Sequence, residues 1–220
     1  MGKTWIQETL RRSKSSLITI RRATQRENIS LENLPVSQHL SHLQYLYINA
    51  GQIPIHMLAQ TLKDPAPFLQ VLELTCIEQY RTRAIALPLD MFANQLPRLR
   101  SLELVNLSFP WATTPLIALV HLKIVLPQRD SAPNPTDPVP PGVQPRPPLA
   151  LADFLDALEH MTLLETMEIL DGLPTPPSGN LHAPAVDHII RLPRLTSIIL
   201  KGLAIDCYNL VRCLQIPPTA

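Results

Sequence analysis

Four charged residues occupy the same place in four similar segments of the chain. Glu73, Glu103, Lys123 and Glu168 each stand between the last two apolar residues of an L-x-x-L-x-L phrase. In parallel strands about 4.8 Å apart, equivalent positions form a row, so we expect Glu73 and Glu103 to be neighbours. Paired carboxylates can act as a general acid and a general base. On an open sheet without a water-excluding pocket both would stay ionised and solvated, so a basic partner segment is the better hypothesis.

Motifs of nucleotide-binding and hydrolytic enzymes are incomplete in this chain. Gly2, Lys3 and Thr4 resemble the end of a phosphate-binding loop, but the upstream glycine and the preceding strand are missing. No G-x-S-x-G turn is present to carry a nucleophilic serine. We therefore expect no catalytic residue, no cofactor site and no enzymatic activity, with a hydrolase or metal enzyme as the weakest alternative.

The spacing of cysteines and histidines also argues against a metal site. Cys207 and Cys213 are six residues apart, and His39 and His42 are three apart, with no second pair at finger-like spacing. With Cys76 the chain has three cysteines, an odd number that does not suit a disulfide framework. We expect reduced thiols, with Cys207 in the core, and no bound metal.

The elements that would position these side chains are predicted by the recurring phrase itself. Six copies of L-x-x-L-x-L, with drift in the apolar residues, occupy residues 43–48, 69–74, 99–104, 119–124, 164–169 and 195–200. Self-similarity at roughly 20 to 29 residues is the signature of leucine-rich repeats. We therefore predict an α/β fold, an irregular leucine-rich-repeat solenoid with parallel strands on the concave face and helices on the convex face.

Proline and helical spacing define the rest of each repeat. Pro67, Pro97 and Pro193 lie two residues before the first leucine, where proline is expected to end a helix before the next strand begins. Apolar residues at helical spacing predict helices over residues 55–62, 89–96, 151–158 and 207–214, the last with Asp206 as its N-cap. Residues 4–10 predict a short opening helix, and residues 16–20 an extra strand at the N-terminal end of the stack.

We treat residues 1–220 as a single repeat domain with two proline-rich breaks. Residues 127–148 carry nine prolines and few apolar side chains, which predicts a flexible insertion, and residues 173–179 form a shorter break. The same phrase resumes after each break, so neither marks a domain boundary. Residues 138–141 fit P-x-x-P, a ligand motif for aromatic grooves, although an inert loop is the simpler interpretation.

Strand positions between the inward-facing leucines should point to the open side of the sheet, because successive side chains alternate faces. These positions form the candidate protein-binding surface. They are Tyr45, Tyr47, Asn49, Val71, Glu73, Thr75, Ser101, Glu103, Val105, His121, Lys123, Val125, Thr166, Glu168, Ser197, Ile199 and Lys201.

Composition and charge set the cellular context. The chain is 45% hydrophobic and has neither a membrane-spanning stretch nor an apolar signal segment at its start, so we expect an intracellular protein, cytoplasmic or nuclear, without a membrane partner. Residues 1–30 carry seven Lys or Arg against two acids. Nucleic-acid binding through this basic segment is an alternative function, but the segment lacks the interleaved aromatics of a stacking platform.

Several phrases together resemble a known family. They are residues 5–20, with Trp5, the run 10–13 (LRRS) and the run 17–20 (LITI); residues 66–74 (APFLQVLEL); residues 87–92 (LPLDMF); and residues 96–104 (LPRLRSLEL). The chain resembles the leucine-rich-repeat region of F-box-like proteins of basidiomycete fungi. The resemblance implies a substrate-recruiting or scaffolding protein of an SCF-type ubiquitin ligase, in which an upstream F-box docks to the ligase adaptor.

Two departures from the family pattern shape the expectation. Nothing before Trp5 matches an F-box bundle, so we expect adaptor binding only if an F-box is supplied upstream, and the chain could be a fragment of a longer repeat protein. The ninth repeat position holds Gly51, Ile77, Leu107 and Leu203 in place of Asn or Cys, which predicts repeats without the usual side-chain ladder. The leading hypothesis is a non-catalytic protein-interaction module with an unidentified target.

Overall fold

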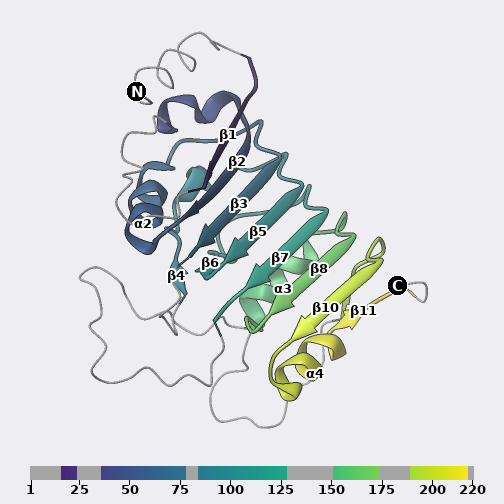
Figure 1. The fold of residues 1–220 in the computed structure, drawn as a ribbon. Helices are drawn as coiled ribbons and strands as arrows, with labels where there is room; N and C mark the ends of the chain where they lie inside the picture. Colours follow the sequence, from purple (N-terminus) through teal and green to yellow (C-terminus); the bar gives the residue numbers. More distant parts are fainter. Residues whose placement is uncertain (1–15, 24–35, 78–83, 128–150, 174–188, 218–220) are drawn as a thin grey trace, which may run out of the picture.

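The computed structural model describes residues 16–23, 36–77, 84–127, 151–173 and 189–217 (Figure 1). Its centre is a seven-stranded sheet in which every neighbouring pair is parallel, in the order β1-β2-β3-β5-β7-β8-β10. The strands are β1 (Ile18–Ala23), β2 (Leu43–Ala50), β3 (Val71–Cys76), β5 (Ser101–Val105), β7 (His121–Val125), β8 (Thr166–Leu170) and β10 (Ser197–Lys201). Each strand is therefore added to the same edge of the sheet as the chain advances.

The leucines of successive phrases are aligned beneath the sheet. Leu46, Leu72 and Leu102 are direct register partners on β2, β3 and β5, and all are almost fully buried. The same row continues through Leu122 and Met167 to Ile198 on β10. Apart from Ile198, which packs against it, these side chains belong to one buried apolar cluster that extends from Ile18 to Leu214. The predicted stacking of the periodic leucines is confirmed, although Ile198 at the last strand is only partly buried.

A reverse turn precedes each strand that carries a phrase. The amide of the first leucine donates to the carbonyl three residues earlier, as in Leu69 to Ala66 (3.1 Å) and Leu99 to Leu96 (3.2 Å). Pro67, Pro97 and Pro193 each occupy the second position of such a turn, which suits the fixed φ of proline. The prolines therefore form a turn at the entry to the strand, instead of directly ending a helix as predicted.

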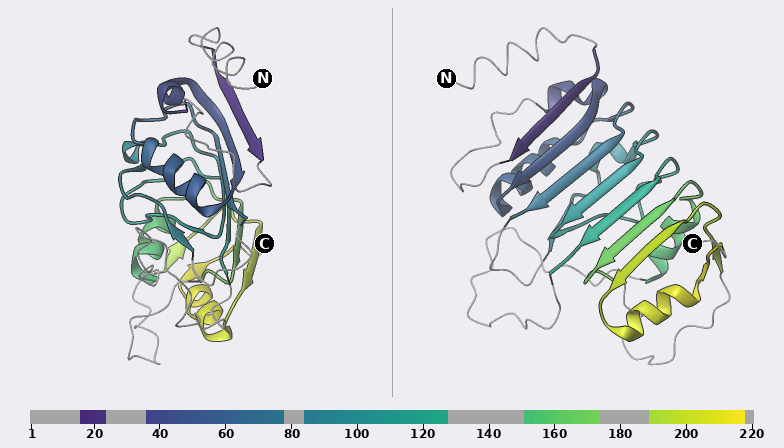
Figure 2. Two further views of the ribbon diagram at one scale, coloured as in Figure 1. Left: turned by 60° about the vertical axis from the view of Figure 1, so that its left-hand side comes forward. Right: turned by 45° about the vertical axis from the view of Figure 1, so that its right-hand side comes forward.

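The helices lie on one face of the sheet (Figure 2). They are α2 (Gln52–Thr61), α3 (Leu151–Glu159) and α4 (Ala204–Arg212), with the 3-10 helices η2 (Ser37–His42) and η3 (Met91–Asn94). The short pairs β4 (Ile85–Ala86) with β6 (Leu107–Ser108), and β9 (Ile190–Arg191) with β11 (Leu214–Gln215), complete the described elements. Because parallel crossovers share one hand and all strands are added in one direction, the connections collect on one face. No helix of the described residues lies on the opposite face.

Two of the predicted helices are present close to their expected positions. In α2, Ile55, Leu58 and Ala59 are buried, and α2 contacts both β2 and β3. In α3, Leu151, Phe154 and Leu158 are buried. Between β5 and β7 the described residues form β6 and a turn but no helix, so the predicted unit of strand, loop, helix and strand does not hold in every connection.

The helix predicted over residues 89–96 is wrong. Leu89 is 68% exposed, and the segment contains only the short η3, in which Phe92, Ala93 and Asn94 have φ values of 53°, 49° and 57°. This left-handed run turns the chain so that the Phe92 amide donates to the Leu62 carbonyl at 2.6 Å while its ring enters the core. Tertiary packing of one aromatic ring has overridden the local helical spacing.

The boundaries of the first strand and the last helix differ from the prediction. The first strand extends over Ile18–Ala23, which is shifted from residues 16–20 but still pairs with β2 at the N-terminal end of the stack. Helix α4 has Leu203 at its N-cap, without a side-chain cap, and Asp206 lies buried in the first turn. Asp206 as the N-cap is therefore wrong. The helix ends at Arg212, so Leu214 lies in β11.

Asn106 joins two neighbouring units in a way that the sequence pattern did not predict. Its side-chain amide donates to the Cys76 carbonyl at 2.8 Å, and its backbone amide donates to the Val125 carbonyl at 2.7 Å. Asn106 has a φ of 60°. Asp171 occupies the equivalent position of a later phrase, seven residues after the first leucine, and has a φ of 56°. Asn and Asp tolerate this region better than other residues with a side chain. A side-chain hydrogen bond between units therefore comes from Asn106, one position before Leu107, where the usual ladder residue was expected.

Several predictions fall outside the described residues. The opening helix at residues 4–10, nearly all of the insertion at 127–148, and all but the first residue of the break at 173–179 belong to this part of the chain. Within the described residues, no helix is both long enough and apolar enough to cross a membrane.

Candidate functional site

The face of the sheet opposite the helices carries the predicted surface residues, and we call it the open face. Along each of β2, β3, β5, β7 and β8, buried residues alternate with residues that are partly or fully exposed. Every residue of the predicted surface lies at one of these accessible positions, or at the corresponding exposed positions of β10. The predicted alternation is therefore confirmed. Its physical cause is that the described helices pack on the face formed by the buried residues.

The central row of the open face is held by ion pairs. Glu73, Glu103, Lys123 and Glu168 are successive register partners on β3, β5, β7 and β8, as predicted. The Lys123 Nζ atom lies 3.2 Å from Glu103 Oε1 and 4.0 Å from Glu168 Oε2. The hydrogen bond with Glu103 is the largest cause that raises the pKa of Lys123. Two glutamates therefore share one lysine, and the group of three keeps a net negative charge.

Glu73 stands next to this ion-paired group without belonging to it. Its carboxylate has no ion pair with any cation in the described part of the chain. Partial burial raises the pKa of Glu73, and the neighbouring Glu103 carboxylate raises it further, while Arg21 and Lys123 lower it. Glu73 was expected to be fully solvated, but its carboxylate is partly buried. Its negative charge is also poorly compensated, since the repulsion from Glu103 adds to the effect of burial.

Aromatic side chains border Glu73 on the side towards β1. The rings of Tyr45 and Tyr47 are stacked with centroids 6.4 Å apart, and Tyr47 is the register partner of Glu73. Arg21 on β1 is the register partner of Tyr47, and its guanidinium lies 5.1 Å from the ring centroid. Cations are attracted to the face of an aromatic ring. The Arg21 side chain is thereby placed over Tyr47, from where its charge also lowers the pKa of Glu73.

The ends of the strands provide further polar contacts. His121 Nδ1 and Thr166 Oγ1 are 2.8 Å apart and share a hydrogen bond across β7 and β8. Lys201 Nζ lies 3.4 Å from Asp171 Oδ2, although 60% of the lysine side chain is exposed. These contacts show a polar surface along both ends of the sheet face.

Three residues of this face were missing from the sequence prediction. Thr19 and Arg21 on β1 continue the rows of Tyr45 and Tyr47, and Leu170 on β8 is the register partner of both Val125 and Lys201. The period of two along residues 18–21 was the available signal, since the buried Ile18 and Ile20 imply that Thr19 and Arg21 face outward. The sequence prediction gave this strand no register with the repeats, so Thr19 and Arg21 were not included in the surface.

No protein-family model, no curated protein and no solved structure matches this chain.

Cysteines and histidines do not gather into a metal site within the described residues. No group of three His, Cys, Asp or Glu side chains lies close enough there to hold a metal ion. His39 and His42 do meet, with His39 Nδ1 3.0 Å from His42 Nε2, but they form a pair alone. Burial and the nearby His42 both lower the pKa of His39. Cys76, Cys207 and Cys213 are not joined in disulfides, and Cys207 packs against the core.

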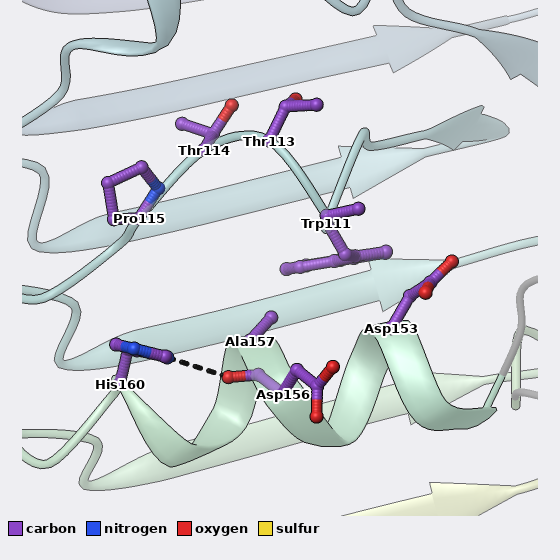
Figure 3. A pocket seen from close by; sticks show the side chains of 9 residues that line it. Trp111, Thr113, Thr114, Pro115, Asp153, Asp156, Ala157 and His160 are labelled. Carbon is purple, nitrogen blue, oxygen red and sulfur yellow. Dashed lines mark hydrogen bonds between the residues drawn. The ribbon is translucent and has the colours of Figure 1, made fainter.

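A small pocket lies away from the open face, between the turn at residues 110–115 and α3 (Figure 3). It has a volume of about 200 Å³ and includes Trp111, Asp153, Asp156 and His160 in its lining. His160 Nδ1 donates to the Asp156 backbone carbonyl at 2.7 Å, and the two carboxylates point away from the imidazole ring. Acid–base catalysis requires groups that converge on one reacting atom. In this pocket the His160 ring is engaged by a backbone carbonyl, and the two carboxylates do not converge with it.

Proposed function

We propose that this chain is an irregular leucine-rich-repeat solenoid that binds a segment of another protein on its open face, without catalysis. The observation that carries the proposal is the one-sided cover of a seven-stranded parallel sheet. Parallel sheets are usually covered on both faces. Here the described helices lie on one face only, and the other displays aromatic and charged side chains in register.

The chemistry of the open face supports binding better than catalysis. Tyrosine is enriched at protein interfaces because it combines a large apolar ring with a polar tip. Tyr45 and Tyr47 provide such a pair, and further along the face the charges of Glu103 and Lys123 form an ion pair. A fixed pattern of charges gives selectivity between partners. Three cysteines that form no disulfide suit the reducing interior of a cell, where we place the protein.

Selection from a phage-displayed peptide library tests this proposal. The immobilised chain is compared with a Tyr47→Ala, Glu103→Lys variant and with a control that carries Tyr208→Ala and Asp90→Lys away from the open face. The control makes the same two chemical changes at exposed positions, one on α4 and one beside η3. We expect selected peptides to lose affinity for the first variant only. Equal binding to both variants, or no selected peptide at all, would contradict the proposal.

The family resemblance extends the proposal to substrate recruitment for an SCF-type ubiquitin ligase. An F-box fused upstream of the chain should then allow a protein tagged with a selected peptide to be ubiquitylated in a reconstituted reaction. The Tyr47→Ala, Glu103→Lys variant should lower this modification, and the control variant should not. A tagged protein that binds the fusion but is never modified would rule out the recruiting role while leaving the binding function intact.

A further inference from the structure

The charges along the central row of the open face are compensated unevenly. Glu103 and Glu168 share the ammonium of Lys123, at 3.2 Å and 4.0 Å. Arg21 is engaged by the ring of Tyr47, which stands between it and Glu73 in the register of β1, β2 and β3. Arg21 and Lys123 both lower the pKa of Glu73, but each is engaged by another group and neither forms an ion pair with Glu73. Glu73 is left as the one carboxylate of the row without an ion pair among the described residues.

The surroundings of Glu73 suit the long side chain of a basic residue. The stacked rings of Tyr45 and Tyr47 lie beside it and offer an apolar surface for methylene groups. Lysine and arginine place their stems on such surfaces and keep the charged end near polar groups. The Arg21 guanidinium, 5.1 Å from the ring centroid, shows that the Tyr47 ring accepts a cation. The half-buried carboxylate then supplies the opposite charge.

We propose that Glu73 and Tyr47 form the recognition site for one lysine or arginine of an extended peptide segment bound across the open face. This inference rests on the proposed function, and it specifies the chemistry of the partner. Because Lys123 already offsets Glu103, the site discriminates by the charge of Glu73 and not by the acidic residues of the row together. A bound cation would favour the ionised form of Glu73, whose pKa burial raises in the free protein.

The experiment uses a phage-displayed nonapeptide library selected separately on three forms of the full chain. They are the wild type, the Glu73→Gln variant and the control variant Asp90→Asn. Glu73→Gln removes the charge with little change in shape. Asp90 is an exposed carboxylate paired with Lys63 at 3.2 Å, beside η3 and away from the open face. We expect Lys and Arg to be enriched in peptides selected on the wild type and on the control, but not on Glu73→Gln. Selected basic peptides should bind Glu73→Gln about tenfold more weakly.

The outcomes separate this inference from the proposed function. Neutral peptides that are lost with Tyr47→Ala, but bind the wild type and Glu73→Gln equally, would overturn the inference and leave the open-face function standing. Basic peptides that bind Glu73→Gln as tightly as the wild type would also overturn it. A wild-type chain that selects no peptide would overturn both. Titration gives an independent measurement, since protonation of Glu73 at acidic pH should weaken the binding of basic peptides.

Discussion

Lys123 and Glu103 are register partners on adjacent parallel strands, and their charged atoms lie 3.2 Å apart. Glu168 approaches the same ammonium from the next strand at 4.0 Å. This arrangement joins three charges of the open face into one ion-paired group with a net negative charge. It also makes Lys123 the residue on which the electrostatics of the row depend.

Replacement of Lys123 by Gln should therefore destabilise the fold by about 0.2 to 1 kcal/mol, the range of partly exposed ion pairs. The loss should be larger at low salt, because salt screens the interaction. The folded state raises the pKa of Lys123, so the pair stabilises fully below its ordinary value of 10.5 and loses this effect as pH rises further. Urea unfolding at two salt concentrations measures the difference. A cost that does not depend on salt would contradict an electrostatic origin.

Truncation of core leucines should have much larger effects. Leu72→Ala or Leu102→Ala removes a fully buried side chain and should cost about 2 to 5 kcal/mol. Ile198→Ala removes the equivalent residue on β10, which is only partly buried, and should cost less than either. Chemical denaturation of the three variants tests this order. Equal losses would mean that β10 is as well covered as the centre of the sheet.

Glu73→Gln should raise the free energy of unfolding at neutral pH by a few tenths of a kcal/mol, the usual scale of surface changes. The folded state raises the pKa of Glu73 above 4.5, so it binds a proton more readily than the unfolded chain, and ionisation above that pH costs stability. The gain should shrink as pH falls towards 4.5. Unfolding curves for both proteins from pH 4 to pH 7 measure it, and a gain that persists unchanged at pH 4 would refute this explanation.

Asn106 allows its two contributions to be separated. Asn106→Gly keeps the left-handed backbone accessible but loses the side-chain bond to Cys76, whereas Asn106→Ala loses the bond and also strains the backbone. We expect a cost of about 1 kcal/mol from the lost hydrogen bond and a further cost of about 1 kcal/mol in the alanine variant. Thermal unfolding compares the two variants. A glycine variant less stable than the alanine variant would show that backbone strain is unimportant here.

Acidification should destabilise the protein partly through His39. The folded state lowers the pKa of His39 below 6.5, so the unfolded chain takes up the proton first as pH falls through that value. Stability should therefore decrease below about pH 6.5, and His39→Gln should reduce this decrease. The free energy of unfolding is measured from pH 7 to pH 5 for both proteins. Equal slopes against pH would contradict the prediction.

The sequence by itself predicted the inward rows and the outward rows of the sheet. The period of two within each phrase fixes which residues are buried, and equal phrases placed side by side fix the register. For that reason Leu72 and Leu102, and likewise Glu73 and Glu103, were correctly expected to be neighbours. The same reasoning failed for residues 89–96, where helical spacing was present but a left-handed run took its place.

Only the tertiary structure decided how the charges of the site are shared. The sequence places Glu73 and Glu103 in equivalent positions, yet Lys123 contacts Glu103 and leaves Glu73 beside the tyrosines. The order of strands across the sheet determines these contacts, because it sets which side chains lie one strand away and which lie two. Periodicity in one dimension specifies which face a residue occupies, whereas its partners on that face depend on distances that exist only in the folded chain.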